Sequence, residues 1–152
     1  MNDLTKKAKE IIEKIEYITL ATTSGNQPWN SPVYSVHDEN FNFYWVSWKE
    51  NTHSKNIREN PNVFLVIYDS TVPEGTGEGV YIKATAKELD NEEEIRIALD
   101  LLYQRKTHKR DWSEFMGDFP RRLYKATSEE VWMNADGEIN GNYIDKRIEV
   151  KL

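Results

Sequence analysis

Near the N-terminus, three strand-like segments follow one another with only short polar turns between them. Residues 17–23 (YITLATT) run into the turn formers Ser24-Gly25-Asn26, and residues 29–36 (WNSPVYSV) and 41–48 (FNFYWVSW) come next. Parallel strands need a long crossover connection, and none fits between these segments. The pattern therefore predicts an antiparallel meander and argues against a doubly wound parallel sheet.

The rest of the chain alternates between helical and strand-like patterns. Apolar residues at helical spacing predict a helix over residues 3–16 and a longer one that begins near Asn91 and finishes in the basic stretch 105–110. Cap-type residues predict a short helix over 51–60, before Pro61. Segment 63–68 (VFLVIY) lacks alternation, as is typical of a strand buried on both faces. The other strand-like segments are 79–89, 123–127, 129–134 and 148–152.

Short strands that are mostly adjacent in sequence favour closure into a barrel, because closure removes their exposed edges. A chain of 152 residues fits one compact domain, residues 1–152. We therefore expect a mainly β fold with α elements, in which an antiparallel β-barrel is flanked by helices.

Composition narrows the function classes. The net charge of −6 and a pI near 5.2 oppose binding to nucleic acid or to an anionic membrane. The absence of cysteine excludes disulfides, thiolate metal sites and cysteine nucleophiles. No apolar run approaches a membrane span, and the N-terminus does not resemble a signal peptide, so we expect a cytoplasmic protein without membrane or nucleic-acid partners. His37, His53 and His108 stand alone in the sequence, and we expect no metal site.

The passage 44–61 (YWVSWKENTHSKNIRENP) is the strongest candidate site. An aromatic strand runs into a helix start, where free backbone N–H groups favour a bound anion such as a phosphate attached to a planar ring system. The alternative is an ordinary capped surface helix with Ile57 packed inward. The candidate donors to the anion are Thr52, His53, Ser54, Lys55 and Asn56.

The order of these segments resembles the FMN-binding split barrel of the pyridoxamine 5′-phosphate oxidase-like superfamily. In that superfamily, similar strands precede a phosphate-binding segment and an Asn-Pro-x-Val strand start, which is Asn60-Pro61-Asn62-Val63 here. The resemblance covers residues 18–89 well. It implies a split β-barrel, FMN as cofactor, and a homodimer with its two cofactor sites in the subunit interface.

By position, the resemblance also implies which residues border the cofactor. Thr52 and His53 stand where the oxidase has a basic pair, so phosphate binding would depend on residues 53–56. Strand alternation allows only one of Trp45 and Val46 to point inward, which leaves core packing open for either. The residues expected at the isoalloxazine ring, largely through backbone groups, are Asn30, Ser31, Pro32, Val33, Tyr34, Trp45, Val46 and Ser47.

The resemblance implies an FMN-dependent oxidoreductase acting on an unidentified small-molecule substrate, without identifying a catalytic residue. The alternatives are a flavin- or haem-binding module without turnover, such as a carrier, sensor or stress-related binder, and a reductase that uses a deazaflavin. The C-terminus (GNYIDKRIEVKL) lacks the Arg-Leu-His-Asp-Arg type of segment with which the oxidase recognises its substrate. We therefore do not expect oxidation of pyridoxamine phosphate itself.

Three further features keep two interpretations each. The Gly-rich loop 69–79 is either a flexible hairpin or a cover for the partner's flavin. The aromatic repeat 112–119 packs in the core or dimer interface, or caps a substrate pocket, and the basic run 106–110 is a solvated helix end or an anion contact. Trp132 and Arg147 lie in the region that approaches the flavin in the relatives.

Overall fold

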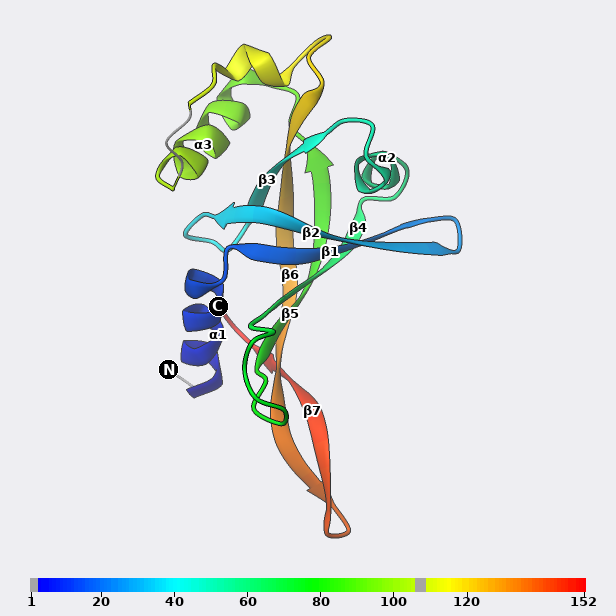
Figure 1. Cartoon of the computed structure of the whole chain (residues 1–152), viewed down its shortest axis with the longest axis vertical. Helices are drawn as coiled ribbons and strands as arrows, with labels where there is room; N and C mark the ends of the chain where they lie inside the picture. Colours follow the sequence, from blue (N-terminus) through cyan, green and yellow to red (C-terminus); the bar gives the residue numbers. More distant parts are fainter. Residues whose placement is uncertain (1–2, 106–108) are drawn as a thin grey trace.

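The chain forms an antiparallel barrel with helices packed on its outside (Figure 1). This is a computed structural model, and it describes residues 3–105 and 109–152. The helices are α1 (Asp3–Lys14), α2 (Thr52–Glu59) and α3 (Glu92–Tyr103), with a short 3₁₀ turn η1 (Trp112–Phe115). The strands are β1 (Tyr17–Ser24), β2 (Gln27–His37), β3 (Phe43–Trp48), β4 (Asn62–Tyr68), β5 (Gly79–Glu88), β6 (Arg121–Ile139) and β7 (Asn142–Val150).

The sheet runs in the order β3-β2-β1-β4-β5-β6-β7, and β3 also pairs with β6. This extra pairing closes the first six strands into a ring. Strand β7 pairs only with β6, and their hairpin projects from one end of the barrel while α3 and η1 lie at the other end (Figure 1). The expected antiparallel barrel flanked by helices is confirmed.

Two buried clusters hold the barrel and its cover together. Alternate residues of the barrel strands, such as Leu20, Leu65 and Ile82, fill the interior, and α1 adds Ala8 and Ile12. A second cluster lies between the barrel wall and α3, which contributes the residues at helical spacing that the sequence predicted. These inward-facing residues of α3 are Ile95, Ala98, Leu99 and Leu102.

The longest predicted helix is shorter than expected. Asn91 caps α3 by accepting a hydrogen bond from the Glu94 backbone N–H at 2.9 Å, but the helix ends at Tyr103, before the basic stretch. Residues 106–108, which carry most of the proposed basic run, lie outside the described residues.

The aromatic repeat 112–119 forms a single 3₁₀ turn rather than a continuous helix. Asp111 caps this turn, Phe115 is buried, and Gly117 adopts a positive φ of 58° after it. Phe119 is consequently 49% exposed and does not continue the buried stripe.

The C-terminal strands differ from the prediction. Segments 123–127 and 129–134 belong to one strand of 19 residues, β6, because the break between them is a β-bulge. In the ladder with β5, Lys83 lies opposite Glu130 and Ala84 opposite Ser128, so Glu129 is the extra residue. Of the predicted segment 148–152, residues 148–150 are the end of β7, which begins at Asn142 after a two-residue turn and stops at Val150.

Strand β4 is not buried on both faces, so the prediction made from its lack of alternation is wrong. Val63, Leu65 and Ile67 face the interior, whereas Phe64 points outward and is 38% exposed. The outer face of β4 is therefore apolar and open in this chain. None of the helices within residues 3–105 and 109–152 is long and apolar enough to cross a membrane.

Candidate functional site

The barrel wall opens between β2 and β3. The two strands pair only through Ser35, Val36 and His37 on β2. Beyond this short ladder, residues 27–34 of β2 pair with β1, and residues 46–48 of β3 pair with β6. In the described chain, the backbone edges that residues 27–33 of β2 and 46–48 of β3 turn toward each other have no strand partner, so their polar groups remain available to a ligand. We call this opening the β2–β3 seam. The segments that border it contain seven of the eight residues predicted at the ring, and Trp45 lies next to them in the short ladder, opposite Ser35.

A histidine from α2 bridges the seam. The Nε2 atom of His53 lies 2.8 Å from Ser47 Oγ on β3, and its Nδ1 atom lies 3.2 Å from Ser31 Oγ on β2. His53 is only 6% exposed, and this burial lowers the pKa of its imidazole. His53 therefore joins the two sides of the seam as a neutral side chain at neutral pH.

Trp29 extends this set of hydrogen bonds along β2. Its Nε1–H donates to Ser31 Oγ at 2.9 Å, although the indole is 47% exposed. Trp29, Ser31, His53 and Ser47 thus form one connected polar chain. Sequence reasoning missed Trp29 because its only signal was its place at the start of a strand.

Two of the predicted anion donors on α2 have other partners. Ser54 Oγ donates to the Trp48 carbonyl at 2.9 Å, and Asn56 Nδ2 donates to Thr22 Oγ1 at 3.0 Å. Both side chains are buried. They attach the helix to β1 and to the end of β3, and so they position the first turn of α2.

One side of the first turn of α2 faces solvent. Thr52 and Lys55 are exposed, and Lys55 Nζ lies 3.5 Å from Glu50. The N-cap residue Asn51 makes no side-chain hydrogen bond to this turn. The backbone N–H groups at this helix end are therefore left for another acceptor.

A shared carboxylate fixes the other end of α2. Glu88 on β5 accepts from Arg58 Nη1 at 3.1 Å and from Tyr124 Oη at 3.0 Å, and Arg122 Nε lies 3.3 Å away. Burial, together with Glu88, raises the pKa of Tyr124. These contacts hold the helix rigidly beside the seam.

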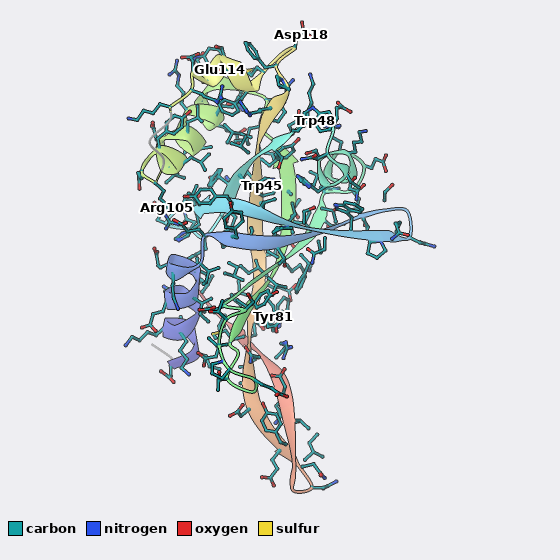
Figure 2. All side chains as sticks on the ribbon, in the orientation of Figure 1. Trp45, Trp48, Tyr81, Arg105, Glu114 and Asp118 are labelled. Atoms are coloured by element: carbon teal, nitrogen blue, oxygen red, sulfur yellow. The ribbon has the colours of Figure 1, made fainter. Side chains whose placement is uncertain are left out.

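The two neighbouring ring candidates on β3 point in opposite directions. Trp45 is fully buried inside the barrel (Figure 2), where it stacks on Tyr124. Val46 points outward and lines a cavity of about 250 Å³ beneath α3 and η1. Core packing therefore accounts for the Trp45 side chain, so Trp45 can meet a ligand in the seam only through its backbone. The other side chains lining this cavity are Leu99, Leu102, Tyr103, Arg110, Phe115 and Arg121.

The candidates on β2 alternate in the same way. Val33 is buried in the barrel, whereas Asn30 and Pro32 are exposed and Tyr34 packs edge-on against Tyr17. Buried and exposed side chains thus alternate along the β2 border of the seam, and Ser31 lies between exposed Asn30 and Pro32 in the sequence.

A second candidate surface lies on the outer face of β4–β7. Phe64 stacks on Trp132 with ring centroids 6.3 Å apart, and the Arg147 guanidinium lies 4.3 Å from the Tyr81 ring. Tyr81 is nearer the β6–β7 hairpin, and Trp48 nearer α2 (Figure 2). We call Phe64, Tyr81, Trp132 and Arg147 the outer aromatic patch. The sequence singled out Trp132 and Arg147 but missed Phe64, because β4 was predicted to be covered on both sides.

The loop between β4 and β5 packs against its own chain. Lys14 Nζ lies 3.1 Å from Asp69, and Lys7 Nζ lies 2.6 Å from Glu78. The Asn134 side chain accepts from the Gly79 N–H at 2.7 Å and donates to the Gly77 carbonyl at 2.8 Å. These contacts attach the two ends of the loop to α1 and β6.

Solved structures of low sequence identity share this fold. An FAD-binding protein from Mesorhizobium loti is 16% identical, with a TM-score of 0.65 over 88% of this chain and 94% of that chain. The haem storage protein HutZ from Vibrio cholerae is 16% identical, with a TM-score of 0.69 over 84% and 92%. General Stress Protein 26 from Bacillus anthracis is 14% identical, with a TM-score of 0.62 over 94% and 98%.

The sequence alone also matches a family. A search of curated proteins finds no match. The family model described as pyridoxamine 5′-phosphate oxidase, however, matches residues 4–135, which is most of the chain. This match and the split-barrel fold confirm the resemblance, and the chain belongs to the pyridoxamine 5′-phosphate oxidase family.

Proposed function

We propose that this protein binds FMN in the β2–β3 seam and acts as a flavin-dependent oxidoreductase on a small molecule. The observation that carries the proposal is the arrangement of the seam: two unpaired strand edges lead to a helix N-terminus without a side-chain cap. The two strand edges suit a planar ring with polar edges, and the helix N-terminus suits a phosphate.

The residues at the first turn of α2 fit a phosphate. The helix dipole and the backbone N–H groups favour an anion there. Thr52 offers a hydroxyl, and Lys55 offers a positive charge that an exposed ion pair with Glu50 offsets weakly. Local donors are required because the chain as a whole carries a net charge of −6.

The seam would hold the ring largely through backbone groups. Residues 30–34 on β2 and 45–47 on β3 would border it, in keeping with their family positions. When bound, the flavin supplies the hydride or electron transfer. The protein's own residues bind and orient the ring, and the substrate would approach its open face.

We propose FMN rather than a larger cofactor because the seam ends at a single anion site. The similar structures include an FAD-binding protein and a haem storage protein, which makes FAD and haem the relevant competitors. Haem is less suited to this site, because both ring nitrogens of His53 already lie within hydrogen-bond distance of serines.

We also propose that the protein is a homodimer whose partner covers the outer aromatic patch. Phe64 is 38% exposed on this face beside Tyr81, Trp132 and Arg147, and large exposed apolar patches mark interaction sites. The β6–β7 hairpin projects beyond the barrel, and a two-stranded hairpin gains stability when another surface packs on it (Figure 1).

The test is a titration of the purified, cofactor-free protein with FMN, riboflavin, FAD and haem. We expect one FMN per protomer and weaker binding of riboflavin, which lacks the phosphate. Reduction of the bound flavin by NADH or NADPH would support the oxidoreductase. Equal affinity for FMN and riboflavin would contradict the phosphate site, and tight binding of haem alone would replace the proposal by a haem-binding function.

A further inference from the structure

The hydrogen bonds of the polar chain across the seam run in one direction, because some of its groups can only donate and others can only accept or do both. Trp29 Nε1–H can only donate, and it lies 2.9 Å from Ser31 Oγ. A neutral imidazole has one N–H donor and one acceptor nitrogen, and each serine has one hydroxyl hydrogen. His53 therefore donates to one serine and accepts from the other.

Two arrangements satisfy this rule. In the first, the Nδ1–H of His53 donates to Ser31, and Ser47 donates to Nε2. In the second, Ser31 donates to Nδ1, the Nε2–H donates to Ser47, and the hydroxyl hydrogen of Ser47 is left over. Ser47 is 8% exposed, and within the described residues His53 is the partner of its hydroxyl. The second arrangement thus leaves the buried donor of Ser47 unused, which is costly, whereas the first leaves over the hydroxyl hydrogen of Ser31, which is only half-buried.

We propose that His53 is a positioning residue that holds the Nδ1–H tautomer and thereby makes Ser31 a dedicated hydrogen-bond donor to the ligand. Both lone pairs of Ser31 Oγ are then occupied, one by Trp29 Nε1–H and one by His53 Nδ1–H. The remaining hydroxyl hydrogen points into the seam, because Ser31 is only half buried on the unpaired edge of β2. Ser31 consequently selects a ligand that places an acceptor atom, such as a ring nitrogen or a carbonyl oxygen, at this point.

The contact distances agree with this direction. The His53–Ser47 contact of 2.8 Å fits a donor of either kind, whereas the 3.2 Å between His53 Nδ1 and Ser31 lies within the range of N–H donors and beyond that of hydroxyl donors. Burial lowers the pKa of His53 and so favours the neutral imidazole, as this arrangement of hydrogen bonds requires.

The first experiment measures the tautomer in the protein without any flavin. Nitrogen-15 NMR of labelled histidine distinguishes a protonated ring nitrogen from an unprotonated one. We expect Nδ1 of His53 to be protonated and Nε2 unprotonated. In Ser47→Ala, which removes the donor to Nε2, the population should shift toward the Nε2–H tautomer. A wild-type protein with Nε2 protonated would overturn the proposal, and so would an unchanged tautomer in Ser47→Ala.

The second experiment measures FMN affinity and rests on the proposed function. Ser31→Ala should weaken FMN binding about two- to tenfold, the effect of one neutral hydrogen bond, whereas Ser31→Thr keeps the hydroxyl and should bind like the wild type. Ser70→Ala, in the exposed β4–β5 loop, is the matched control. Equal binding by Ser31→Ala and the wild type would overturn the donor role. Failure of the wild type to bind FMN would instead contradict the proposed function, and the tautomer measurement would be unaffected.

Discussion

Trp45 and Tyr124 stack at the centre of the barrel, with ring centroids 5.6 Å apart and an angle of 13° between their planes. They lie opposite each other in the ladder of β3 and β6, which is the pairing that closes the ring. Neither side chain is exposed. The closure of the barrel therefore depends on a buried aromatic pair next to the proposed cofactor site.

Replacing Trp45 should destabilise the whole fold. Trp45→Ala removes a large buried side chain and leaves a cavity, so the free energy of unfolding should fall by about 3–5 kcal/mol. Trp45→Phe should cost less, because it keeps an aromatic ring on Tyr124. Urea unfolding measures both, and Trp48→Ala is the control, since Trp48 is 53% exposed. A loss from Trp45→Ala no larger than that of the control would contradict the role of the pair.

The phosphate site can be tested by removing one positive charge, that of Lys55. Lys55→Ala should weaken FMN binding by about 1–3 kcal/mol, the range for hydrogen bonds to charged groups, and should leave riboflavin binding unchanged. Lys109→Ala is the control, because this exposed lysine is remote in sequence from α2. Fluorescence titrations at two salt concentrations separate a direct contact from general attraction, which salt screens more strongly. An equal effect of the two substitutions would indicate general attraction.

The buried histidine should make stability depend on pH. Burial lowers the pKa of His53 in the folded state below its ordinary value near 6.5, so the unfolded chain takes up this proton more readily. Its contribution to stability should be complete above about pH 6.5 and should decrease as the pH falls below that value. His53→Gln keeps a donor and an acceptor without titrating. The unfolding free energy of wild type minus that of His53→Gln should therefore decrease between pH 7.5 and 5.5, and a constant difference would contradict this assignment.

The proposed dimer predicts a specific disruption. Phe64→Asp places a charge in the outer aromatic patch, where it would be buried against a partner, so the protein should become monomeric by light scattering. Ile97→Asp on α3 is the control, because Ile97 is 51% exposed outside the patch. A wild-type protein that is already monomeric at micromolar concentration, with FMN bound, would refute the dimer.

Local patterns were sufficient to predict most of the elements, and failed where pairing between distant strands decides the structure. The end of the predicted strand at Thr127 is a bulge at Glu129, which exists only because β5 supplies the opposing residues. The hairpin at Asn140 and Gly141, with φ values of 51° and 76°, could have been predicted from the Asn-Gly pair alone.

The sequence indicated which segments come together at the candidate site, but not the contacts that their side chains make. His53 was identified as an anion donor, but its contacts are with Ser31 and Ser47, which are 22 and 6 residues away in the sequence. Such contacts depend on how far β2 and β3 separate, and no local pattern encodes that separation. Ser54 and Asn56 similarly resembled ligand donors, although tertiary packing makes them anchors of the helix.

The position of β7 outside the barrel has a consequence for solubility. A strand with one paired side offers its other backbone edge to any strand from another molecule, which is how sheets extend into aggregates. Along this edge, β7 carries Asp145, Lys146, Arg147 and Glu149 within nine residues. An incoming strand would have to desolvate these charges, so the sheet stops growing at its own last strand while its aromatic face stays available for association.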